Sequence, residues 1–155
     1  MGKGKIKRRG IYVTDTVSKE QRRKNMQAIR SQSKLENRVS RELWKRGIRF
    51  RKNDKSLLGK PDISIKKYKV AIFIDSCFWH ACKLHGNKPK SNQAYWDKKL
   101  ARNKERDIIV TEYYNLNGWF LKRVWEHEIK EDMQQVVNDL VTFIEYAKQQ
   151  ESLTE

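Results

Sequence analysis

Apolar residues recur at helical spacing in the first third of the chain. Leu35, Val39 and Leu43 repeat every four residues, which predicts a buried helical stripe that Gly47 terminates. Two Ser-x-x-Gln/Glu patterns, at 18–21 and 33–36, have the spacing of capping boxes, which mark helix starts. We therefore expect two helices, one over about 18–30 and a second from 33 to about 46.

The same periodicity predicts two helices in the second half of the chain. One covers residues 92–117, where Gly118 supplies a stop signal, and the other covers about 130–148. The side chains expected in the core from these two helices are Trp96, Leu100, Ile108, Tyr113, Met133, Val136, Val137, Leu140, Val141 and Ile144.

Short apolar runs between the helices predict strands near Phe50, over 62–65, over 70–74 and over 119–125, with a turn at 66–68. Residues 70–74 are continuously apolar, which is typical of a strand covered on both faces and central to its sheet. The order of elements predicts an α/β fold, a mixed central sheet flanked by helices, in one domain over 18–150.

The charge balance bears on the partner. The formal net charge is +16, from 35 Lys and Arg against 19 Asp and Glu, and so basic a surface favours nucleic acid. A basic protein without such a ligand is the alternative. Residues 1–17, rich in Lys, Arg and Gly, are expected to form a disordered basic arm. Since the chain shows neither a membrane-spanning run nor a secretory signal, we expect a cytoplasmic protein with no membrane partner.

Two aspartates flank the predicted strand pair. Asp62 starts one strand and Asp75 ends the next, so a hairpin would bring both carboxylates to one edge of the sheet. Two carboxylates at one point repel unless a cation lies between them, and Mg²⁺ prefers hard oxygen ligands. The alternative is that both acids cap turns.

Both cysteines and two of the three histidines fall in one short segment. Cys77, Cys82 and His85, with His127, supply the four ligands of a closed tetrahedral zinc site, which is structural rather than catalytic. Spacing alone also allows His80 to replace His85. A His80 left out of the zinc site would lie near the two aspartates and could accept a proton from a metal-bound water.

The run Cys77-Phe78-Trp79-His80, preceded by an apolar strand and by Gly59-Lys60-Pro61-Asp62, resembles the very short patch repair (Vsr) endonucleases. Further matches in the same order are Arg23-Lys24-Asn25-Met26, Pro89-Lys90-Ser91-Asn92, Arg102-Asn103, Arg106-Asp107, Gly118-Trp119 and Val124-Trp125-Glu126-His127. The resemblance covers about 18–128. It implies a restriction-endonuclease-like fold and magnesium-dependent cutting of one DNA strand beside a thymine mispaired with guanine, the mispair left by deamination of 5-methylcytosine.

The resemblance also implies roles for single residues. Asp62 and the backbone carbonyl of Ile74 would hold Mg²⁺, and His80 would be the catalytic histidine. Glu36 and Asp107 would be supporting carboxylates, although Glu36 could instead serve only its capping box. The implied zinc ligands are Cys77, Cys82, His85 and His127, and the implied DNA contacts are Phe78, Trp79, Trp96, Arg23, Lys24 and Asn25.

The chain departs from the family pattern at two positions. Asp75 stands where some members carry histidine. It is therefore either a direct metal ligand or an acid that supports another metal ligand. The general nuclease motif places a lysine two residues after the second acid, but Cys77 occupies that position, which increases the part expected of His80.

The partner implied is double-stranded DNA with a T:G mispair, with mismatch-repair or repair-polymerase proteins as further candidates. A single-strand nick needs one active site, so we expect a monomer. Two alternatives stay open: a restriction-type or branched-DNA nuclease of the same fold, and a non-catalytic zinc-stabilised DNA-binding module.

Overall fold

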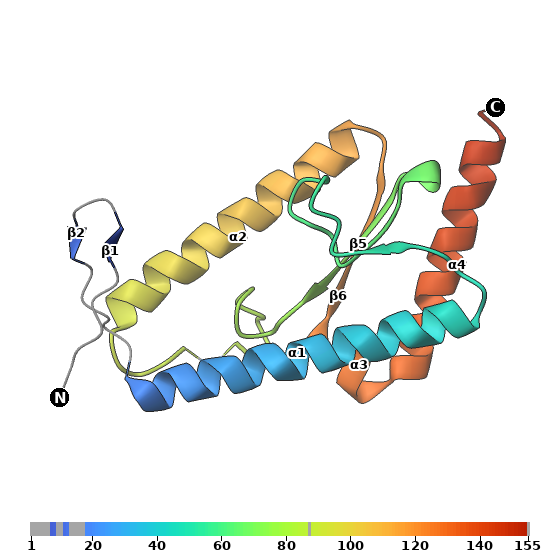
Figure 1. The fold of residues 1–155 in the computed structure, drawn as a ribbon. Coiled ribbons are helices and arrows are strands. Elements are labelled where there is room, and N and C mark those ends of the chain that lie inside the picture. The colour runs from blue at the N-terminus through green and yellow to red at the C-terminus, as the bar shows by residue number, and fades with distance from the viewer. Residues whose placement is uncertain (1–6, 9–10, 13–17, 87, 155) are drawn as a thin grey trace. The chain divides into compact units, whose positions relative to one another are not determined.

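The structure, a computed structural model, describes residues 7–8, 11–12, 18–86 and 88–154 (Figure 1). The chain divides into two compact units, Met1–Ser31 and Gln32–Glu155. In the first unit, β1 (Lys7–Arg8) pairs antiparallel with β2 (Ile11–Tyr12). Within the arm predicted over residues 1–17, the described residues are therefore short paired strands, and the remaining arm residues lie outside the described part.

One continuous helix, α1 (Lys19–Lys45), replaces the two helices expected between residues 18 and 46. The first capping box does mark a helix start, because the N–H of Gln21 donates to Oγ of Ser18 at 3.1 Å. The second lies inside the helix. No Gly or Pro occurs between residues 19 and 45 to interrupt backbone bonding, and Ser and Glu are tolerated in helix interiors. Gly47, at φ 81°, ends the helix as predicted.

A four-stranded mixed sheet lies in the second unit, in the order β3–β4–β5–β6. Its strands are β3 (Arg51–Lys52), β4 (Ile63–Ile65), β5 (Val70–Asp75) and β6 (Phe120–Trp125). The β3–β4 and β4–β5 pairs are antiparallel, whereas β5 and β6 run parallel. All six residues of β5 are buried, which confirms the prediction of a central strand covered on both faces.

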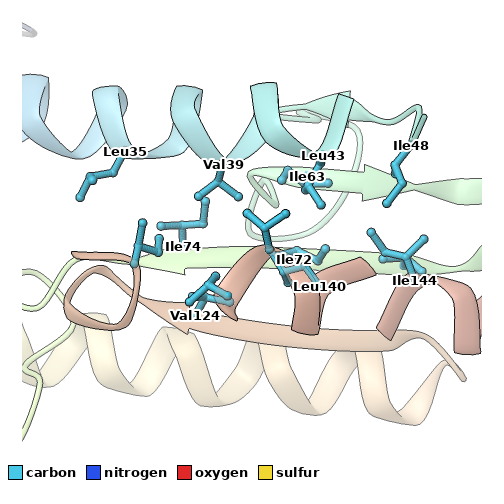
Figure 2. Packing of buried hydrophobic residues seen from close by; sticks show 14 of the residues in the cluster. Leu35, Val39, Leu43, Ile48, Ile63, Ile72, Ile74, Val124, Leu140 and Ile144 are labelled. Carbon is cyan, nitrogen blue, oxygen red and sulfur yellow. The ribbon is translucent and has the colours of Figure 1, made fainter. Parts of the chain in front are cut away.

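Helices cover both faces of this sheet. They are α1, α2 (Gln93–Leu116), α3 (Glu126–Glu131) and α4 (Met133–Ser152). Ile72 and Ile74 of β5 lie on the face covered by α1 and α4. Figure 2 shows them beside Leu43 of α1 and Leu140 of α4. The alternate residues of β5 pack against α2 instead. Within the described ranges, no helix combines the length and apolar content that crossing a membrane requires.

The final helix differs from its predicted bounds of about 130–148. The short helix α3 ends before Asp132, whose Oδ1 accepts a hydrogen bond from the N–H of Gln135 at 3.0 Å and so caps the start of α4. The predicted core stripe of this helix is buried at Val136, Val137, Leu140 and Ile144. Met133 and Val141 are half-buried at its margin.

The buried face of α2 was predicted correctly only in its first half. Trp96 and Leu100 are buried, but Ile108 is 51% exposed and Tyr113 is 45% exposed. The residues that meet the sheet are Val110 and Tyr114. The apolar residues of this part of α2 lie on several sides of the helix. Their spacing alone therefore does not show which side packs against the sheet.

Candidate active site and metal centre

The antiparallel pairing of β4 with β5 brings the start of one strand beside the end of the other. The N–H of Ile74 donates to Oδ2 of Asp62 at 2.7 Å. Asp62, Ile74, Asp75 and His80 line one pocket of about 570 Å³. The expectation that strand pairing gathers these groups at one edge of the sheet therefore agrees with the geometry.

The Asp62 carboxyl lies in a site that resists negative charge. Burial raises its pKa to about 6, and the nearby charge of Asp75 adds to this effect, while the Ile74 N–H and His80 oppose it. A buried carboxylate beside another acid is stabilised by a cation. The donor set at this edge, made of carboxylate oxygens, fits a hard divalent ion such as Mg²⁺.

Two carboxylates orient the His80 ring. Its Nδ1 lies 2.5 Å from Oδ2 of Asp107 and 3.8 Å from Oδ1 of Asp75. Burial opposes a charged imidazole, but the Asp107 hydrogen bond and the two negative charges outweigh it, so the pKa of His80 is raised. Since Nδ1 is engaged by Asp107, Nε2 is the ring nitrogen that can accept a proton in the neutral form.

Arg123 was missed in the sequence analysis. Its Nη1 lies 2.9 Å from both carboxylate oxygens of Asp75, which is only 4% exposed. It also donates from Nε to Oγ1 of Thr111 at 3.2 Å and from Nη2 to the carbonyl of Asp107 at 3.3 Å. One partial signal was available: Arg123 is a charged residue within the predicted strand 119–125.

Glu36 reaches the same pocket from the middle of α1. The alternative that Glu36 serves only a capping box is wrong, because no helix begins at Ser33. Gly59 and Lys60, in the loop before Asp62, and Arg106 of α2 complete one side of the pocket lining.

The predicted zinc ligands form a compact cluster. The donor atoms of Cys77, Cys82, His85 and His127 all lie within 4.8 Å of one another. Nδ1 of His127 is 3.3 Å from Sγ of Cys77 and 3.6 Å from Sγ of Cys82. A tetrahedral zinc ion bound to sulfur and nitrogen would separate them by about 3.5 Å. The structure therefore places His85 in the cluster and His80 with Asp107.

Strand register explains why this cluster forms. Asp75 at the end of β5 pairs with Trp125 at the end of β6, so Cys77 and His127 each lie two residues beyond a matched pair. Burial and the neighbouring Cys82 thiol raise the pKa of Cys77, while His127 lowers it. A cation would relieve this resistance to thiolate formation, so the cluster can hold a metal ion.

An aromatic group lies beside the pocket. The ring centroid of Phe78 is 4.8 Å from that of Trp79 and 5.4 Å from that of Trp96. Phe78 and Trp79 are half-buried, whereas Trp96 is 6% exposed and forms the inner part of the group. The Lys99 ammonium lies 5.1 Å from the Trp79 ring, which places a positive charge at this surface.

The remaining expected DNA contacts belong to the first unit. Arg23 and Lys24 are exposed on α1, and Oδ1 of Asn25 accepts a hydrogen bond from Nε2 of Gln21 at 3.0 Å. Lys24 also pairs with Glu20 at 3.1 Å.

Comparisons with known proteins show which family this chain resembles. A family model described as "DNA mismatch endonuclease Vsr" matches residues 14–85. The type II nicking enzyme V.NaeI of Lentzea aerocolonigenes is 44% identical over 131 residues, 81% of this chain and 79% of the relative. The type II nicking enzyme V.NmeDIP of Neisseria meningitidis serogroup C is 41% identical over 118 residues, 74% and 80% respectively. DNA mismatch endonuclease Vsr of Escherichia coli (strain K12) is 34% identical over 116 residues, 74% of each chain.

Proposed function

The chain belongs to the Vsr family of DNA endonucleases, and from that premise we propose that it nicks one strand of duplex DNA beside a T:G mispair by magnesium-dependent hydrolysis. The observation that carries the proposal is the pocket shared by Asp62, Ile74 and His80. It combines a carboxylate for a divalent ion with an oriented histidine that can move a proton.

Asp62 and the backbone carbonyl of Ile74 are the proposed magnesium ligands, with Glu36 as a supporting acid on the α1 side. When bound, Mg²⁺ would supply charge neutralisation at the phosphate and make a coordinated water more acidic. The buried Asp62 carboxyl, with its pKa of about 6, fits this role because ionisation becomes favourable once a cation is near.

His80 is the proposed general base. Asp107 bonds to Nδ1, which leaves Nε2 to take the proton from the attacking water. The water oxygen then bonds to phosphorus, the bond from phosphorus to the 3′ oxygen breaks, and that oxygen takes a proton from a solvent water molecule to become the 3′-hydroxyl. The other product carries the 5′-phosphate.

We propose that Cys77, Cys82, His85 and His127 hold a structural Zn²⁺. Cys77 and Cys82 flank the turn that carries His80, and His127 lies just after β6. The metal would therefore fix the His80 turn against the sheet.

DNA is proposed to bind through the aromatic group and the basic surface. Phe78 and Trp79 would enter the base stack where a mispair has weakened it, with Trp96 packed behind them. Arg23, Lys24 and Asn25 are proposed contacts to the phosphate backbone. A net charge of +16 predicts binding that weakens steeply with salt.

A nicking assay tests the proposal. Two duplex pools would carry the same randomised flanking bases and differ only in a central T:G or C:G pair, so that the preferred flank can be read from the cut products. We expect Mg²⁺-dependent cutting of the thymine strand in the T:G pool, and sequencing of the cut ends would give the flank. Equal cutting of both pools, or no Mg²⁺-dependent cut, would contradict the proposal. Asp62→Asn should bind the duplex without cutting it.

A further inference from the structure

We propose that Arg123 is a positioning residue of the nicking reaction and that Asp75 is its buried counter-ion rather than a magnesium ligand. The inference rests on the proposed function for its kinetic part. Its structural part, which concerns what Asp75 binds, can be tested without any DNA cutting.

Asp75 already has a cationic partner. Both of its carboxylate oxygens lie 2.9 Å from Nη1 of Arg123, and the Asp75 side chain is buried while that of Arg123 is 20% exposed. A divalent ion bound to either oxygen would lie within a few ångströms of the guanidinium charge. Because like charges repel more strongly beside a buried carboxylate than in open water, this placement disfavours magnesium at Asp75. Asp62 has no such cation among its hydrogen-bond partners in the described residues.

Arg123 also ties α2 to the end of β5. Its Nε and Nη2 bond to Thr111 and to the Asp107 carbonyl on α2, while Nη1 bonds to Asp75. The guanidinium carbon lies 4.7 Å from the centre of the Phe73 ring, which restricts its plane. All three nitrogens therefore have acceptors within the protein, which is the arrangement of a bracing residue rather than one that reaches for phosphate.

The bracing matters because the contacts of the His80 turn hold its backbone, whereas the ring is oriented by Asp107. Asp75, His80, Asp107 and Arg123 line the proposed active-site pocket and also a second cavity of about 660 Å³. Since the four side chains border two cavities, their positions depend on the hydrogen bonds and ion pairs among them. Arg123 fixes the carbonyl of Asp107, whose carboxylate in turn holds Nδ1 of His80. We infer that Arg123 sets the position of the general base through Asp107.

Arg123→Met is the first test. We expect nicking to slow by about 100-fold at saturating DNA, with the KM for DNA changed by less than about threefold, because a small displacement of the base impairs chemistry more than binding. Binding of Mn²⁺, titrated by the electron paramagnetic resonance signal of the free ion, should be as tight as in the wild type or tighter, because a positive charge has been removed. A general loss of structure would instead weaken both DNA binding and Mn²⁺ binding.

The double variant Arg123→Met/Asp75→Asn tests the counter-ion. It removes two opposite charges together, so Mn²⁺ affinity should stay within about threefold of the wild type. Nicking should be no slower than in the single variant, because the effects of mutating two residues that act as one unit do not add. Asp62→Asn should lose Mn²⁺ binding. Arg46→Met is the matched control: its guanidinium bonds to Asn138 and Gln134, which line neither cavity, and its nicking rate should be unchanged.

The outcomes separate the two proposals. Loss of Mn²⁺ binding in the double variant would make Asp75 a ligand and overturn the inference, as would wild-type nicking by Arg123→Met. A wild-type protein that never nicks would overturn the proposed function, yet the Mn²⁺ titration would still decide the role of Asp75. If Arg123→Met does not fold, the double variant carries the rate test. Arg123→Lys carries it if neither folds, since an ammonium cannot reach three acceptors in one plane.

Discussion

The Ile74 N–H donates to Oδ2 of Asp62, 2.7 Å away, and this contact joins the start of β4 to the end of β5. Because the two strands are hydrogen-bonded neighbours, the carboxylate is held by the sheet rather than by a loop. A carboxylate held in this way can bind an ion with little rearrangement. Its burial also affects the free energy of unfolding.

Asp62 should destabilise the metal-free protein at neutral pH. Its pKa is raised from 3.8 to about 6 on folding, so the unfolded state ionises more easily and stability should fall as pH rises from about 4 to about 6. Asp62→Asn should therefore raise the free energy of unfolding at pH 7 by up to about 3 kcal/mol without metal. Urea denaturation with and without Mg²⁺ checks this: Mg²⁺ should stabilise the wild type only. A variant less stable than the wild type in chelator would contradict it.

The pH dependence of nicking should report on His80. A protonated imidazole cannot accept a proton, and the pKa of His80 is raised, so the rate should climb with pH through a value above the ordinary 6.5. Asp107→Asn removes the hydrogen-bonded charge that raises this pKa. Its rising limb should therefore move to lower pH, while its plateau rate falls by about 10- to 100-fold. Both profiles are measured at saturating Mg²⁺, so that the ion affects both equally. If the rising limbs of the wild-type and Asp107→Asn profiles coincide, Asp107 does not raise the pKa of His80.

The two neighbouring histidines give a matched pair for the zinc site. His85→Gln should lose the metal because His85 is in the Cys/His cluster, whereas His80→Gln should retain it and lose nicking. Elemental analysis of each purified variant measures zinc per chain, with one expected for the wild type. Chelation should also lower the melting temperature of the wild type, because metal binding and folding are coupled. Zinc retained in His85→Gln but lost in His80→Gln would reverse the assignment.

Gly59 should be essential for the loop that leads into Asp62. It adopts φ 73°, and an added Cβ would lie 2.9 Å from Cγ1 of Val110 and 3.3 Å from Cε1 of Phe73. Gly59→Ala combines backbone strain with this clash and should lower the unfolding free energy by about 2–4 kcal/mol. Gly118→Ala is the control, since Gly118 has φ 69° but open space around it, and strain alone should lower stability by about 1–2 kcal/mol. Urea denaturation compares the two, and equal losses would show that the clash is relieved elsewhere.

The sequence predicted those parts of the fold in which one local signal dominates. The apolar run 70–74 indicated a central strand, and adjacency to residues 62–65 was enough to pair Asp62 with the end of that strand. The matched motifs then indicated the family, because many residue types in one order are rarely coincidental.

Other features depend on contacts that spacing does not encode. The capping pattern at 33–36 is compatible with a helix interior, so the continuity of α1 was missed. Spacing alone did not choose between His80 and His85, and only the resemblance favoured His85. The structure places His85 in the cluster and the His80 ring against Asp107, which is far along the chain. Arg123 acquires its role from a parallel neighbour that lies 48 residues earlier, a pairing that no local pattern shows.

The parallel alignment of β5 with β6 makes the chain intolerant of length changes at two places at once. Paired positions 75 and 125 are followed at equal intervals by Cys77 and His127 and preceded closely by Arg123. A deletion of one residue from either segment would shift a thiol or imidazole out of the cluster and slide the guanidinium away from its carboxylate in the same step. Substitutions could be accommodated one at a time, but insertions and deletions there would have to occur in both segments together.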